Sequence, residues 1–237
     1  MAYGMQIFND NADQLIDTND PNEKLYLVAG GGVISSASFA NYSYQGAAGS
    51  TLKSYSVALS GTPAPSLEHA LVFVRPHTQT NYDITIGGHL NTNGTSFTIF
   101  RSDNTAGINV EYKICIPADE HTLSTLETGY GINVYTGDAT PKLHWSSNAA
   151  GSRITEAMRG EFATVTRPGA WALAVDYADQ IVLDQTNVEF SVYGFMVNWN
   201  NGVLSFKSKH YARYPWYGSS ATYGLSAAPQ TLIGEFF

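Results

Sequence analysis

The stretch Tyr193–Ser208, YGFMVNWNNGVLSFKS, decides the fold class because it has the pattern of a β-hairpin. Large side chains alternate with other residues on either side of Asn201-Gly202, which places one row of side chains on a buried face. Asn-Gly between two such runs is a strong hairpin signal, since a type I′ turn requires positive φ at both central positions. The stretch therefore predicts two antiparallel strands joined by a tight turn.

The same pattern occurs twice more, in Tyr3–Thr18 and Tyr130–Ser147. Each copy opens with Tyr-Gly, turns on Asn, Asp or Gly, and returns through a large residue two places before a hydroxyl. We expect the three hairpins to superpose, Met5 with Ile132 and Phe195, Ile7 with Val134 and Val197, and the large return residue of each copy, its anchor, with the other two. These anchors are Ile16, Trp145 and Phe206. We expect Gly4, Gly131 and Gly194 to lie where a side chain would clash or where the strand bends.

Further strand-like segments follow one another at short intervals and are separated by Gly, Pro and Asn, as in an antiparallel β-sandwich. They are 24–29, 55–59, 70–76, 83–86, 96–100, 110–114, 170–175 and 188–192. Residues 152–162 fit a helix or a strand, and we interpret them as extended. We predict an all-β protein with an N-terminal β-sandwich domain at 1–118, a linker at 119–128 and a C-terminal β domain at 129–237. Phe73, in the most apolar segment, is expected in the core of the first domain.

The composition restricts the function. Among 237 residues, 43% are hydrophobic and only 14% are charged, against about 25% charged in ordinary soluble domains. A weakly charged surface is common where neighbouring copies cover it. The net charge of −8 lacks the electrostatic footprint of a nucleic-acid binder. No run approaches the roughly 20 apolar residues that span a bilayer, so we expect no membrane insertion.

Candidate catalytic and metal-binding residues are few and scattered. Cys115 is the single cysteine and lies in a predicted strand interior, which indicates a buried, inert thiol. The glycines at 30–32 follow a strand but lack the spacing of a phosphate-binding loop, so we interpret them as a turn. The acidic cluster Asp119-Glu120-His121 fits a solvated linker. The histidines have no ligand spacing, and we predict no catalytic residue, cofactor or metal.

The C-terminal segment is rich in aromatic residues, which concentrate in interfaces and sugar sites. We expect it to contact other molecules rather than to form a core strand, because it is also rich in Gly and Ser. An apolar chain end is usually docked, and the alternative is that this tail folds back over its own sandwich. The candidate interface or glycan-binding residues are Tyr211, Tyr214, Trp216, Tyr217, Tyr223, Phe236 and Phe237.

The segment Tyr3–Asp10, YGMQIFND, together with Leu15–Thr18 and Leu71–Pro76, resembles a family of small structural proteins of long-tailed bacteriophages. These are tail-tip or tail-fibre-associated proteins in which a Tyr-Gly hairpin recurs. The resemblance is strongest over about the first 120 residues and returns in the two later hairpins. It implies a virion component that forms a homo-oligomer, a trimer, and contacts other tail proteins, and it carries no catalytic residues.

We therefore expect a structural subunit of a phage tail tip or tail fibre that is assembled in the host cytoplasm and contributes to host attachment. The start of the chain has no signal-peptide pattern, so lysis is the expected route out of the cell. Two alternatives stay open. One is a carbohydrate-binding module that recognises a host-surface glycan or receptor through the exposed aromatics. The other is a glycan-degrading enzyme that uses carboxylates distant in sequence.

Overall fold

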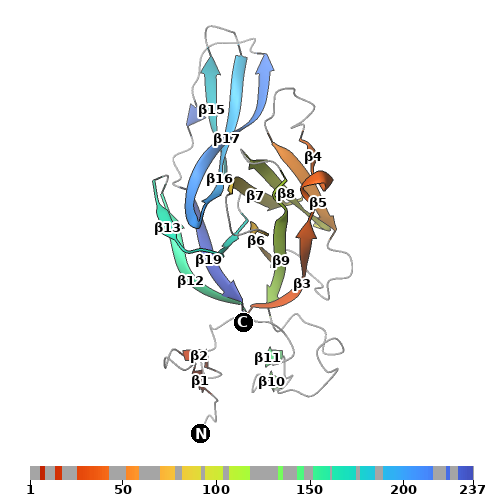
Figure 1. The fold of residues 1–237 in the computed structure, drawn as a ribbon, viewed down its shortest axis with the longest axis vertical. Coiled ribbons are helices and arrows are strands. Elements are labelled where there is room, and N and C mark those ends of the chain that lie inside the picture. Colours follow the sequence, from red (N-terminus) through yellow and green to blue (C-terminus); the bar gives the residue numbers. More distant parts are fainter. Residues whose placement is uncertain are drawn as a thin grey trace.

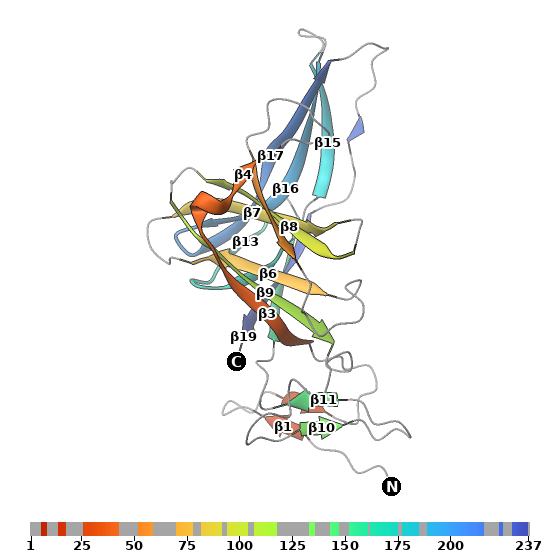
Figure 2. The same cartoon turned by 90° about the vertical axis from the view of Figure 1, so that its right-hand side faces the viewer.

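The computed structural model describes residues 6–8, 14–17, 26–42, 52–58, 70–77, 82–91, 94–103, 107–117, 133–135, 143–146, 152–160, 162–174, 177–184, 189–215, 223–224 and 229–236. These residues form a nearly all-β structure in which two antiparallel sheets pack together (Figure 2). The predicted all-β sandwich is confirmed. In the part of the chain that the structure describes, no helix is long and apolar enough to cross a membrane.

One layer of the sandwich is a six-stranded antiparallel sheet with the order β12-β19-β14-β6-β9-β3. Its strands are β3 (Tyr26–Ile34), β6 (Leu71–Pro76), β9 (Val110–Pro117), β12 (Ser152–Arg159), β14 (Trp171–Leu173) and β19 (Gln230–Phe236). The ambiguous segment 152–162 is thus extended over its first eight residues, as predicted. Figure 1 shows β3 and β12 at the two edges of this sheet.

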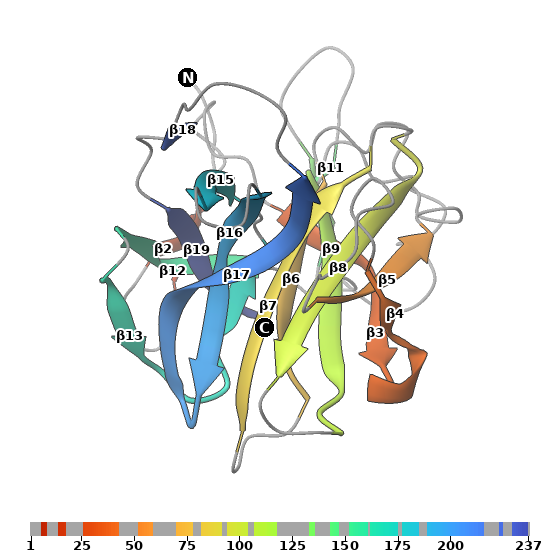
Figure 3. The same ribbon diagram turned by 90° about the horizontal axis from the view of Figure 1, so that it is seen from above.

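The second layer is a nine-stranded sheet in which β13-β17-β16-β7-β8-β5-β4 form the main path and β15 and β18 extend from β16. Its strands are β4 (Ala40–Asn41), β5 (Lys53–Ala58), β7 (Asp83–Leu90), β8 (Ser96–Asp103), β13 (Thr164–Thr166), β15 (Tyr177–Asp184), β16 (Glu189–Asn200), β17 (Val203–Pro215) and β18 (Tyr223–Gly224). A single 3₁₀ turn, η1 (Ser36–Ser38), leads from β3 to β4, and Ser35 caps it. Seen from above in Figure 3, this layer crosses over the six-stranded sheet.

Two further hairpins stand apart from both layers. They are β1 (Gln6–Phe8) with β2 (Gln14–Asp17), and β10 (Asn133–Tyr135) with β11 (Leu143–Ser146). Figures 1 and 2 show both beyond the end of the sandwich where β3 begins and β9 ends.

The main core fills the space between the two layers. Alternating residues of β6 and β9 face residues of β7, β8 and β16, and the largest of them is Trp199, which is almost fully buried. The buried members from these strands are Val72, Val74, Val110, Ile114, Ile84, Ile86, Phe97, Ile99, Val197 and Trp199. This two-sided packing of inward-facing residues is what holds a β-sandwich together.

The six-stranded sheet also carries a buried cluster on its other face. Phe73, Cys115 and Trp171 form it, with Leu173 and Phe236 packed alongside. Phe73 is fully buried, as predicted. It lies in this second cluster and not in the main core, because its side chain points to the face opposite that of Val72 and Val74. The buried thiol of Cys115 is confirmed.

Strands from both halves of the chain share the two layers. The predicted first domain contributes β3, β6 and β9 to the six-stranded sheet, and the predicted second domain contributes β12, β14 and β19. The nine-stranded sheet also combines strands of both predicted domains, since β16 pairs with β7. One sandwich therefore unites the two segments, 1–118 and 129–237, that the sequence predicts as separate domains. The predicted linker at 119–128 lies outside the described residues.

The glycines at 30–32 lie inside β3, so the predicted turn was wrong. They pair in register with Lys113 and its neighbours on β9, after a bulge between Val28 and Gly30. A Cβ atom on Gly31 would lie 2.6 Å from the carbonyl oxygen of Tyr112. The close approach of two backbones, rather than a change of chain direction, requires glycine here.

Candidate interaction site

The three predicted hairpins form, and each anchor lies opposite the equivalent residue of the first strand. Ile7 lies opposite Ile16, Val134 opposite Trp145, and Val197 opposite Phe206. In the first two copies the register shifts directly after this pair, so β1–β2 and β10–β11 share a bulge at the same position. The third copy continues without a shift there, and its strands belong to the nine-stranded sheet. Gly4 and Gly131 lie outside the described residues.

The turn of the third hairpin has the predicted geometry. Asn200 pairs with Val203, and the two residues between them, Asn201 and Gly202, have φ of 47° and 89°. Positive φ at both positions is what a type I′ turn requires. The side-chain oxygen of Asn201 also accepts a hydrogen bond from the backbone N–H of Tyr82 at 3.0 Å. The turn is thereby fixed to the start of β7.

Beyond the sandwich, β16 and β17 continue into a projecting sheet that also contains β15 and β18. We call this sheet, residues 177–184, 189–193, 211–215 and 223–224, the arm; it stands above the sandwich in Figures 1 and 2. Bulges flank β16 on both sides at its base. The register with β17 shifts between Val192 and Tyr193, and that with β15 shifts opposite Gly194. Bulges bend and twist a sheet locally, so this pair of bulges redirects the strands into the arm. Gly194 thus lies where β16 bends, as predicted.

The register gives the arm two different faces. Leu183, Phe190 and Tyr214 occupy one cross-strand row. Two residues further along, on the same face, come Ile181, Val192 and Ala212, and Tyr223 of β18 lies opposite Ile181. The other face carries a row of Val182, Ser191 and Arg213 and a row of Asp184, Glu189 and Pro215. Rows of apolar and aromatic residues therefore alternate with rows that are mostly polar.

The structure separates the predicted candidate residues into two places. Tyr211, Tyr214 and Tyr223 belong to the arm, where Tyr211 is the extra residue of the β17 bulge. Tyr211 and Tyr214 lie in the last part of β17, and Tyr223 lies in β18, so these residues form strands, but strands of the projecting arm. Phe236 ends β19 in the sandwich. Trp216, Tyr217 and Phe237 lie outside the described residues.

Phe236 packs on its own chain. Its ring makes edge-on contacts with Phe73 and Trp171, with centroids 5.5 and 5.1 Å apart, and the ammonium of Lys113 lies 4.3 Å from its centroid. Such aromatic and cation–π pairs add to the burial of the rings. For Phe236 the alternative that the chain end folds back over its own sandwich is the observed one.

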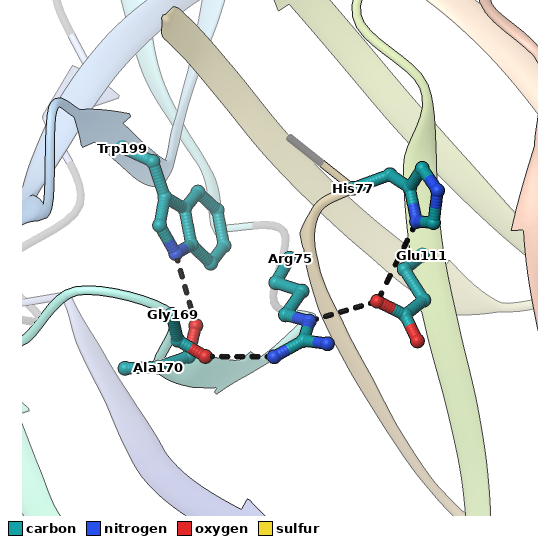
Figure 4. A network of polar contacts seen from close by, with 6 residues as sticks. All are labelled: Arg75, His77, Glu111, Gly169, Ala170 and Trp199. Carbon is teal, nitrogen blue, oxygen red and sulfur yellow. Dashed lines mark hydrogen bonds and ion pairs between the residues drawn. The ribbon is translucent and has the colours of Figure 1, made fainter. Parts of the chain in front are cut away.

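Next to this cluster, a polar network ties the connection before β14 to both layers (Figure 4). Arg75 Nε donates to a carboxylate oxygen of Glu111 at 2.8 Å, and Arg75 also donates to the carbonyl of Gly169 at 3.1 Å. From the core side, the indole N–H of Trp199 donates to the carbonyl of Ala170 at 3.3 Å. The Arg75 guanidinium lies 4.4 Å from the Trp171 ring centroid. These contacts hold β14 in place, so we assign Arg75, Glu111 and Trp199 a structural role.

The described residues contain no group of His, Cys, Asp and Glu that could hold a metal ion. His77 lies 3.8 Å from the Glu111 carboxylate, at the margin of the same network. At the base of the arm, the rings of Tyr193 and His210 meet with centroids 5.2 Å apart. Burial raises the pKa of Tyr112 above its usual value of 10.0, with a further contribution from Tyr55.

Sequence reasoning identified the tyrosines of the arm but missed the apolar residues that accompany them, among them Leu183 and Phe190. The apolar run 181–183 and the alternation in 189–192 were the available signals. Comparison of the chain with protein-family models, curated proteins and solved structures found no match.

Proposed function

We propose that the protein is a structural subunit of a bacteriophage tail tip or tail fibre that assembles as a homo-oligomer and contacts other tail proteins through its arm. The observation that supports this role best is the repeated hairpin. The register of β1–β2 and of β10–β11 coincides down to the position of the bulge, as expected for the recurring Tyr-Gly hairpin of the family that the sequence resembles.

The arm supplies a surface suited to such contacts. Its strands leave the sandwich at paired bulges, and the register pairs Phe190 with Tyr214 and Ile181 with Tyr223. Aromatic residues dominate the energetics of protein interfaces because they bury a large area at low entropic cost. The threefold symmetry implied by the resemblance is part of the same proposal.

The test is complementation of a phage that lacks the gene. Wild-type protein should restore infectivity and be detected on the tail by immunogold labelling, and light scattering should give a multiple of three times 25.7 kDa. Tyr214→Ala in the arm should reduce incorporation into tails, whereas Tyr55→Ala, at an exposed tyrosine of β5, should not. A monomeric protein, or tails that are complete without it, would contradict the proposal.

A second role, recognition of a host-surface glycan, is favoured by the position of Tyr211. As the extra residue of the β17 bulge, it lies where bulges typically re-aim a side chain. A glycan array should then show binding that Tyr211→Ala abolishes without change in the melting temperature. Absence of binding to any host polysaccharide would reject this role and leave the structural one.

A further inference from the structure

The edges of the two sheets differ in how they are protected against pairing with another strand. Natural proteins protect sheet edges by shortness, charge or proline. In the nine-stranded path, the edge strands β4 and β13 have two and three residues. In the six-stranded sheet, β12 carries Arg153, Glu156 and Arg159, but β3, YLVAGGGVI, has nine residues and no charge. Among the edge strands of the two main paths described, β3 is the long, uncharged one.

The outer side of β3 has the features of a pairing surface. Gly31 and Gly32 are exposed, and Val33 is 48% exposed. Backbone groups of an antiparallel strand point alternately to its two sides, and β9 is the strand partner of β3 in the described chain. Part of the N–H and C=O groups of 28–34 therefore point away from the sheet, with only small or apolar side chains beside them.

The segment after the bulge is regular enough to be extended by another strand. Five consecutive pairs, from Gly30 opposite Ile114 to Ile34 opposite Val110, hold it against β9. The backbone contact of Gly31 with the Tyr112 carbonyl keeps the two strands close together. An incoming strand would meet a template whose conformation is already fixed.

We propose that this edge pairs, antiparallel, with the β3 edge of a second copy of the chain about a twofold axis. In such a contact each residue of β3 lies opposite a residue of β3 in the second copy. A charged residue on β3 would therefore lie near its own copy across the axis, and the two like charges would repel each other. The strand carries none. With Gly31 on the axis, Gly30 lies opposite Gly32 and Ala29 opposite Val33, and the two six-stranded sheets become continuous.

This contact goes beyond the proposed role in a tail and does not depend on it. Twofold pairing gives an even number of copies: a dimer by itself, or six copies when combined with a threefold axis. A protein that is no tail component would still dimerise through β3. A tail trimer without β3 pairing would have three times the mass of one chain.

Hydrogen exchange and light scattering of the full chain test the pairing. We expect an even multiple of 25.7 kDa, and the outward N–H groups of 28–34 should become protected as the protein concentration rises. An odd multiple, or exchange of 28–34 that stays fast and independent of concentration while the protein assembles, would overturn the inference.

A pair of proline variants supplies the matched control. The N–H groups of adjacent strand residues point to opposite sides, so one of Gly32→Pro and Val33→Pro removes an outward group, and the other removes a bond to β9. The variant that keeps the wild-type circular dichroism should have half the mass of the wild-type assembly. If it keeps the full mass, the pairing is wrong. If neither variant folds, the concentration dependence of exchange decides.

Discussion

Replacement of Phe73 by alanine tests the buried cluster on the outer face of the six-stranded sheet. Phe73 is fully buried against Trp171 and Phe236, with the Phe236 ring edge-on at 5.5 Å. Truncating a buried phenylalanine costs about 3–5 kcal/mol, because burial is lost and a cavity remains. For a chain of this size each kcal/mol lowers the melting temperature by about 2–4 °C, so we expect a decrease of about 6–20 °C.

The control is Phe162→Ala, which removes the same side chain from a position that is 90% exposed. Its effect should stay within about 0.5 kcal/mol. Both variants are compared with the wild type by thermal unfolding followed by circular dichroism. If Phe73→Ala and Phe162→Ala have the same melting temperature, Phe73 is not buried and the buried cluster on the outer face of the six-stranded sheet does not exist.

A double-mutant cycle then isolates the ring contact. If the edge-on geometry of Phe73 and Phe236 contributes beyond simple burial, the two alanine variants should be non-additive by about 0.5–1.5 kcal/mol. Additive losses would mean that Phe236 does not pack on Phe73 in solution.

Three further changes test local features. Gly31→Ala should lower the melting temperature clearly more than Gly32→Ala, since the nearest atom to the new Cβ is a carbonyl oxygen at 2.6 Å in the first case and an aromatic carbon at 3.4 Å in the second; equal losses would contradict the close backbone approach. The free energy of unfolding should fall as the pH rises above about 10, because the raised pKa of Tyr112 means that the folded state prefers the neutral phenol. Tyr112→Phe should make this decrease smaller, as measured by urea unfolding between about pH 8 and pH 11. Asn201→Ala should cost about 1–2 kcal/mol by chemical unfolding, since it loses both the hydrogen bond from Tyr82 and a residue that tolerates positive φ, and a variant as stable as the wild type would contradict this.

Local patterns in the sequence predict much of this fold because side-chain alternation and turn residues act over a few positions. The Asn201-Gly202 turn and the pairing of Val197 with Phe206 depend on residues close together in the chain. Burial of Cys115 and extension of 152–159 are local in the same sense.

Sheet order could not be obtained in this way, because it depends on contacts between distant segments. β6 pairs with β14, which lies roughly a hundred residues later along the chain. The sequences of the two strands indicate only that both are apolar and not that they are neighbours. The same limit explains the error at 30–32. Three glycines favour a turn in local terms, and only the carbonyl of Tyr112 on the neighbouring strand explains them as strand residues.

The candidate site was predicted in part. The tyrosines at 211, 214 and 223 were recognised by their number, but their arrangement depends on bulges opposite Tyr193 and Gly194 that the sequence does not indicate. The packing of Phe236 on its own chain was given only as the alternative, because a terminal aromatic gives no signal of the partners that it packs against, here Phe73 and Trp171.

The burial of both faces of the six-stranded sheet determines where another molecule can attach to it. Its inner face contacts the main core through Val72 and Val74, and its outer face carries the buried cluster of Phe73 and Trp171. Along β6 the side chains on both faces are thus already buried, whereas the edges of the sheet offer backbone groups for pairing. Of these edges, β12 is charged and β3 is not. The nine-stranded sheet instead extends into the arm. Assembly through the β3 edge and contact with a different partner through the arm therefore use separate parts of the molecule, and whichever of Gly32→Pro and Val33→Pro keeps the wild-type fold should affect the first without changing the second.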